Sequence, residues 1–254
     1  LVFIHDGDPQ AETDGAKPID SAQFFTRLGQ RIIHLLTTQT NSGQLYDVDM
    51  RLRPSGASGL LVSSLGAFER YQQNEAWTWE HQALVRARVL VGCKQVGAAF
   101  EGVRAKVLGQ ARDLEKLRDE VSEMRAKMRD NLGTKATAAG TAANAFDAGV
   151  PFDIKQDAGG IVDIEFMVQY AALAWSREHP QLLRYTDNIR ILDGLEEAAL
   201  MSSDDVRLLQ EAYKAYRAAA HRQALQKQPG VVSGDQFHPE RRGVLRIWHA
   251  LGLN

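Results

Sequence analysis

Charged and apolar residues alternate strictly along the stretch Tyr46-Asp47-Val48-Asp49-Met50-Arg51-Leu52-Arg53. This period of two is typical of a β-strand, on which successive side chains point to opposite faces. We therefore expect a strand over 46–53 with Asp47, Asp49, Arg51 and Arg53 on one face. Carboxylates two residues apart on a strand can bind Mg²⁺, and arginines further along can hold phosphate groups. The alternative is an ordinary half-exposed strand whose polar face neutralises itself.

A loop of small residues, Pro54-Ser55-Gly56-Ala57-Ser58-Gly59, follows directly. Small residues let backbone N–H groups approach a phosphate, so Ser55 and Gly56 are candidate nucleotide-binding residues. The same composition is also typical of an ordinary turn. Leu60-Leu61-Val62 is predicted to be a returning strand.

The stretch Trp77-Thr78-Trp79-Glu80-His81-Gln82 places two tryptophans beside polar residues. The indoles could stack on a base, but packing in the core is the favoured interpretation. Arg86 and Arg88 follow two residues apart on a predicted helix. Residues so spaced do not share a helix face, so at most one of them points into any given site.

A third polar set lies in Lys155-Gln156-Asp157-Ala158-Gly159-Gly160-Ile161-Val162-Asp163. Asp157 is expected to cap a helix that begins near Gly160, where the dipole also favours Asp163 in the first turn. Capping explains these residues adequately, yet Lys155, Asp157 and Asp163 also make a plausible polar set around a nucleotide. The residues alone leave both interpretations open.

The remaining pattern indicates an α+β protein. A short strand is expected at 1–5, then a helix entered through Asp20 or Ser21, and a helical stretch over 65–108 broken near Gly92. An amphipathic helix should end at Gly133, a mobile connection should occupy 134–149, and the rest should be helical. We therefore expect a small α/β portion over 1–107 and a helical bundle over 108–254.

Charge and cysteine content exclude several classes of protein. The 254 residues carry 30 basic and 32 acidic side chains, so no global field favours nucleic acid or an anionic membrane. The single cysteine, Cys93, excludes an internal disulfide framework and agrees with a cytoplasmic location. No apolar run reaches the ~20 residues of a membrane span. Because Leu1 opens a predicted core strand, the chain is expected to be a fragment.

Five blocks of this sequence closely resemble the glutamine synthetase adenylyltransferase family. They are Leu45 to Gly56, Asn74 to Arg88, Phe152 to Lys155, Gly159 to Phe166 and Asp187 to Leu192. Proteins of this family have two related halves, one deadenylylating and one adenylylating. The string Asn-Glu-Ala-Trp-Thr-Trp-Glu-His at 74–81 is similar to the C-terminal, adenylylating half.

The resemblance implies a partial polymerase-β-like nucleotidyltransferase core over 1–107, followed by the helical domain. The Gly-rich loop and Asp-x-Asp of that family would lie immediately before Leu1 and are absent here. Asp49 matches the family's third carboxylate, whereas Asp47 occupies a position where the family need not have an acid. The resemblance thus implies Asp49 as the catalytic residue and a metal ligand, with Asp47 as a second candidate ligand.

The implied reaction is attack by a tyrosine hydroxyl of glutamine synthetase on the α-phosphorus of ATP, with Mg²⁺ as cofactor. Arg51, Arg53, Ser55 and Gly56 would hold the nucleotide, and Lys155, Gly160 and Asp163 would close the site. A nitrogen-signalling regulatory protein is a possible further partner. The alternatives are the deadenylylating, phosphorolytic half and a non-catalytic helical module that docks one of these proteins. The fragment alone is expected to be inactive.

Overall fold

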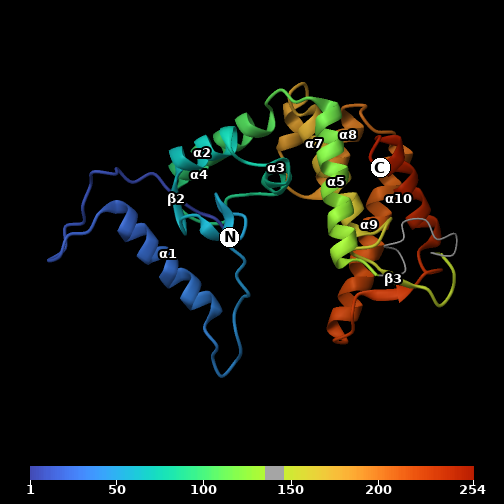
Figure 1. The fold of residues 1–254 in the computed structure, drawn as a ribbon, viewed down its shortest axis with the longest axis horizontal. Coiled ribbons are helices and arrows are strands. Elements are labelled where there is room, and N and C mark those ends of the chain that lie inside the picture. Colours follow the sequence, from blue (N-terminus) through green and yellow to red (C-terminus); the bar gives the residue numbers. More distant parts are fainter. Residues whose placement is uncertain (135–145) are drawn as a thin grey trace. The chain divides into compact units, whose positions relative to one another are not determined.

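The computed structural model describes residues 1–134 and 146–254, which divide into two compact units (Figure 1). Unit 1 comprises Leu1–Ala83 and Arg88–Val107, and unit 2 comprises Leu84–Ala87 and Leu108–Asn254. Most of the predicted connection at 134–149 lies outside the described residues. The assignment of 1–107 as a nucleotidyltransferase domain and 108–254 as a helical domain stays a prediction.

Unit 1 contains a small parallel sheet, in which β1 (Phe3–His5) pairs with β2 (Val62–Ser64). Its helices are α1 (Ser21–Thr37), α2 (Leu65–Asn74), α3 (Thr78–Val85), whose last two residues belong to unit 2, and α4 (Lys94–Leu108), whose last residue belongs to unit 2. The carboxylate of Asp20 accepts the N–H of Gln23 and caps α1, as predicted. Gly29 lets α1 approach β2, since a Cβ there would lie 2.9 Å from Val62 Cγ2.

The prediction of a strand over 46–53 is wrong. Residues 46–50 have no regular structure, turns follow from Arg51, and Gly56–Ser58 form a short 3₁₀ helix, η1. The physical reason is local: the Asp49 carboxylate binds the N–H of Arg51 two residues later, which bends the chain instead of extending it. The predicted returning strand is present as β2, shifted from 60–62 to Val62–Ser64.

The helical stretch over 65–108 is broken near Gly92, as predicted, where the glycine has φ +138°. A second, unpredicted break separates α2 from α3. The side chains of that break explain it, since the carboxylate of Glu80 accepts hydrogen bonds from the hydroxyl of Tyr71 at 2.8 Å and the N–H of Trp77 at 2.9 Å. The favoured core packing of both tryptophans is wrong for Trp77, which is 69% exposed.

Unit 2 is a helical bundle around α7 (Ile161–Trp175), which packs against α5 (Leu114–Leu132), α8 (Asn188–Glu197), α9 (Ser203–Leu225) and α10 (His238–Ala250). Most residues of α7 are buried on every side, which is the pattern of a central helix. Asp187 and Ser202 cap α8 and α9 through their side chains. The antiparallel pair β3 (Pro151–Asp153) and β4 (Val231–Ser233) was not predicted from the sequence, nor was the 3₁₀ helix η2 (Pro180–Leu183).

Candidate functional site

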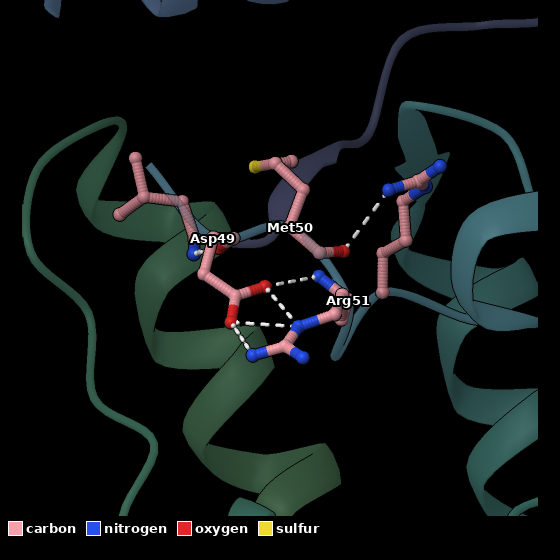
Figure 2. Close-up of polar contacts among 5 residues, drawn as sticks. Asp49, Met50 and Arg51 are labelled. Atoms are coloured by element: carbon pink, nitrogen blue, oxygen red, sulfur yellow. Dashed lines mark hydrogen bonds and ion pairs between the residues drawn. The ribbon is translucent and has the colours of Figure 1, made fainter. Parts of the chain in front are cut away.

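Asp49, the predicted catalytic residue, lies in an exposed turn of unit 1 and is held by Arg51 (Figure 2). Arg51 donates its backbone N–H to Oδ1 at 2.8 Å, and its Nε and Nη2 to Oδ2 at 2.9 Å and 2.6 Å. These hydrogen bonds from Arg51 lower the pKa of Asp49 to about 2. Asp49 is therefore a carboxylate, already paired with one cation, at any pH near neutrality.

Arg53 contacts the backbone of its own loop. Its Nη1 donates to the carbonyl of Met50 at 3.1 Å, its Nη2 to that of Ala57 at 3.0 Å and its Nε to that of Gly59 at 3.3 Å. One planar guanidinium thus ties together both ends of the loop. In this structure Arg53 stabilises the loop after Asp49, and its predicted role toward a nucleotide stays a prediction.

The loop itself is a tight turn. Ser55 and Gly56 both have positive φ, +59° and +55°. The left-handed region is costly for Ser55, and such a conformation persists where surrounding contacts hold it. Gly59 is required by close packing, because a Cβ there would meet the carbonyl oxygen of Pro54 at 1.8 Å. The small-residue composition is therefore explained by the turn, and nucleotide binding by Ser55 and Gly56 is untested.

Asp47 lies two residues before Asp49 and is exposed. Within residues 1–134 and 146–254, no group of three or more histidine, cysteine, aspartate or glutamate side chains is arranged to hold a metal ion. Mg²⁺ is usually bound through one or two carboxylates, with waters and substrate phosphates as its other ligands, so a set of three protein ligands is not required. The assignment of Asp49 and Asp47 as ligands of Mg²⁺ stays a prediction.

Asp163 lies in unit 2 and forms a buried ion pair with Arg125. Its Oδ1 accepts Nε of Arg125 at 2.6 Å, and both side chains are fully buried. Its Oδ2 accepts the N–H of Gly159 at 2.6 Å, and Nη2 of Arg129 lies 3.7 Å from Oδ1. Burial lowers the pKa of Arg125, and the charge of Asp163 opposes that change. The carboxylate of Asp163 is therefore engaged within the bundle, which favours a structural role.

The predicted cap of α7 is wrong. Gly160 is the N-cap residue, while the buried Asp157 accepts the N–H groups of Asp153 and Thr134, each at 2.8 Å. Gly160 is required, since a Cβ there would lie 2.6 Å from the carbonyl oxygen of Ile154. Lys155 is exposed. These residues belong to unit 2 and Asp49 to unit 1, so their meeting in one site stays a prediction.

Sequence reasoning missed a polar cluster in unit 2. Nη1 of Arg86 lies 3.0 Å from Oε1 of Glu165 and 3.4 Å from Oδ1 of the buried Asn188, and the hydroxyl of Tyr213 also lies 3.4 Å from Oε1 of Glu165. Arg88 is exposed, in agreement with the expected difference between the two arginines. Each contact joins residues that are 48 or more positions apart in the sequence. The only signal in the sequence for this cluster is that unusual polar motifs recur along the chain.

In the described part of the chain, no helix is both long enough and apolar enough to cross a membrane. Two family models match different portions of the sequence. A model of glutamate-ammonia ligase adenylyltransferase matches residues 1–103, and a model of PII-uridylyltransferase matches residues 122–230.

Individual proteins match along the whole chain. The chain is 87% identical over 254 residues to a bifunctional glutamine synthetase adenylyltransferase/adenylyl-removing enzyme of Pseudomonas putida, all of the chain matching 26% of that protein. Proteins of the same name from Pseudomonas aeruginosa and Nitrosococcus oceani are 77% and 54% identical, with 26% and 25% of their lengths matched by 100% and 99% of this chain. The chain therefore spans about a quarter of these relatives and belongs to the glutamine synthetase adenylyltransferase/adenylyl-removing enzyme family.

Proposed function

We propose that this chain is part of an enzyme that transfers AMP from ATP to a tyrosine hydroxyl of glutamine synthetase. The observation that carries the proposal is the 87% identity along the whole chain to a protein named for that activity. The proposal includes a partial polymerase-β-like core in the first 107 residues and a cytoplasmic location. It assigns the chain to the adenylylating half, on the motif at 74–81.

In the proposed reaction, the tyrosine oxygen forms a bond to the α-phosphorus while the bond to the β-phosphate bridging oxygen breaks, releasing pyrophosphate. The hydroxyl proton must leave, so an ionised carboxylate near the nucleophile favours the reaction. Asp49 is proposed for this role because its carboxylate is exposed and Arg51 holds it in place through two side-chain hydrogen bonds to Oδ2. Arg51 is also a donor that can turn from Asp49 to a phosphate oxygen, since its side chain is 85% exposed.

Mg²⁺ would be held in part by Asp49, with Asp47 as a second candidate ligand, and when bound it would neutralise negative charge on the phosphates. Asp49 contributes one anionic oxygen donor. Further protein ligands, and a Gly-rich loop, would have to come from residues outside this chain. We therefore expect that the 254-residue chain alone transfers no adenylyl group at a useful rate, and that extending it upstream through an Asp-x-Asp restores transfer.

The decisive variant is Asp49→Asn in the full-length protein, assayed by incorporation of labelled AMP into unmodified glutamine synthetase. This change keeps the shape of the side chain and removes its charge, so transfer should fall by about 100-fold or more. Asp14→Asn is the matched control, because Asp14 is an exposed carboxylate of the same unit outside the proposed site. An Asp49→Asn protein as active as the control would refute the assignment.

The second candidate function is phosphorolytic deadenylylation, in which an oxygen of inorganic phosphate forms a bond to the AMP phosphorus of adenylylated tyrosine while the bond from that phosphorus to the tyrosine oxygen breaks, giving ADP and the free tyrosine hydroxyl. The printed name of the relatives covers both activities. Assaying the Asp49→Asn protein on adenylylated and unmodified glutamine synthetase separates the two. Loss of transfer alone supports the adenylylating half, and loss of ADP release alone supports the other.

A non-catalytic docking module is the remaining alternative. One observation in unit 2 supports this alternative, because the carboxylate of Asp163 is held inside the bundle instead of facing a ligand. If the Asp49→Asn protein keeps both activities but deletion of residues 108–254 abolishes binding of glutamine synthetase, this alternative explains the chain better.

A further inference from the structure

Four elements of unit 2 meet at a polar cluster that the proposed reaction does not use. Arg86 is the first residue after α3, Glu165 lies on α7, Asn188 begins α8 and Tyr213 lies on α9. All four belong to the same compact unit, in which α7, α8 and α9 pack against one another (Figure 1). The side chains of Arg86 and Glu165 are 35% and 22% exposed, so the cluster reaches the molecular surface.

Asn188 contributes a buried hydrogen-bond donor to this cluster. The residue is only 1% exposed, and its Nδ2 has no hydrogen-bond partner in the described part of the chain. Its Oδ1 accepts Nη1 of Arg86 at 3.4 Å, which fixes the orientation of the amide, because the opposite orientation would place two donors together. A buried donor without a partner is costly. Since both amide atoms lie beside the same guanidinium, an oxygen of a ligand bound there would satisfy Nδ2.

Arg86 contributes a second, charged set of donors. Its contacts with Glu165 and Asn188 use Nη1 alone, and the structure gives its Nε and Nη2 no hydrogen bond to a described residue. These two groups form the parallel fork that binds two oxygens of an anion. The charge of Glu165 opposes such an anion only in part, because its Oε1 already accepts Nη1 of Arg86 and lies 3.4 Å from the hydroxyl of Tyr213.

The residues that lead into α8 add positive charge. The guanidiniums of Arg184 and Arg190 lie 5.1 Å and 4.3 Å from the ring centre of Tyr185, and both arginines are exposed. Asp187 pairs with Arg190 at 2.5 Å, so it compensates one of these two cations and Arg184 adds a net positive charge. The N-terminus of a helix also favours an anion, and α8 begins at Asn188. The surroundings of the cluster therefore favour a negatively charged ligand.

We propose that this cluster binds a phosphate group, which accepts hydrogen bonds from Nε and Nη2 of Arg86 and from Nδ2 of Asn188. Three donors suit a tetrahedral phosphate better than a carboxylate, which has only two oxygens. The partly exposed side chain of Arg86 shifts outward as the ligand enters and gives it access to Nδ2. Inorganic phosphate and the phosphate of a nucleotide share this chemistry. All of the donors belong to unit 2, so the site goes beyond the proposed adenylyl transfer and does not depend on it.

The test is equilibrium dialysis of the full-length protein with radiolabelled inorganic phosphate at constant ionic strength, with unlabelled phosphate, AMP and acetate as competitors. We expect saturable binding of phosphate, which acetate displaces at least tenfold less effectively than unlabelled phosphate does. Stronger displacement by AMP than by phosphate identifies a nucleotide as the source of the group, and weaker displacement identifies free phosphate. Absence of saturable binding, or equal displacement by acetate, would overturn the proposal. Because ATP and glutamine synthetase are both left out, failure of the adenylyl transfer assay would leave this result unaffected.

Variants locate the bound phosphate. Asn188→Asp keeps the shape of the side chain but replaces the donor by an anion, so it should weaken phosphate binding at least tenfold. Arg86→Lys keeps the charge that pairs with Glu165 and removes the fork, so about tenfold weaker binding is expected. Arg88→Lys is the matched control, an exposed arginine two residues along the chain and outside the cluster, and should leave the affinity within about twofold of wild type. Circular dichroism checks that each variant keeps its fold. Phosphate affinity that is unchanged in both cluster variants would place the binding elsewhere and refute the proposal.

Discussion

Replacing Arg125 by methionine would remove one member of a fully buried ion pair and leave the other behind. Asp163 would keep the N–H of Gly159 at 2.6 Å, but its nearest remaining cation would be Arg129, 3.7 Å away. Methionine has a length similar to that of the arginine stem, so the dominant loss is electrostatic. The variant therefore measures the cost of a buried carboxylate without its partner.

The expected destabilisation is about 3 to 5 kcal/mol, the range found when one partner of a buried pair is removed. For a unit of this size, that corresponds to a fall of roughly 10 °C in the midpoint of thermal unfolding. Lys127→Met is the matched control on the same helix, since Lys127 pairs with Glu123 at 2.6 Å with both side chains more than 60% exposed. An exposed pair of this kind contributes less than about 1 kcal/mol.

Urea unfolding followed by circular dichroism gives the free energy of unfolding of each protein. The proteins compared are the wild type, Arg125→Met, Lys127→Met and the double variant Arg125→Met/Asp163→Leu. The double variant should recover most of the loss, because it removes the uncompensated charge together with its partner. A loss below about 1 kcal/mol for Arg125→Met, or a double variant less stable than the single one, would refute this account of the pair.

Two further predictions concern single polar groups. Tyr216→Phe should leave the free energy of unfolding unchanged or raise it by about 1 kcal/mol, because the fully buried hydroxyl has no hydrogen-bond partner in the described structure; a clear loss in urea unfolding would contradict this. Arg51→Ala should raise the pKa of Asp49 from about 2 toward 3.8, measured by NMR titration of the carboxylate, and an unchanged pKa would show that Arg51 is not its cause. Since the folded-state pKa is the lower one, any stability that this pair adds is present above pH 3.8 and lost as the pH falls toward 2.

Tertiary structure overturned the prediction at 46–53 for a specific reason. Alternation of charged and apolar residues predicts a strand only if a neighbouring strand accepts its backbone hydrogen bonds, and in unit 1 β1 pairs with β2 instead. Without such a partner, the carboxylate of Asp49 and the guanidinium of Arg53 bind nearby groups of their own turn. Local side-chain hydrogen bonds of this kind compete with strand formation. The alternation of residues does not predict which of the two forms.

The sequence by itself determined that the first helix is entered at Asp20 or Ser21, because a capping side chain acts on an N–H group only three residues away. It also carried the family resemblance, which depends on residue identity alone. Only the tertiary structure decided which polar residues are engaged with one another. Arg125 meets Asp163 across 38 residues and Arg86 meets Glu165 across 79, and no local rule reports contacts made by folding segments so far apart in the chain.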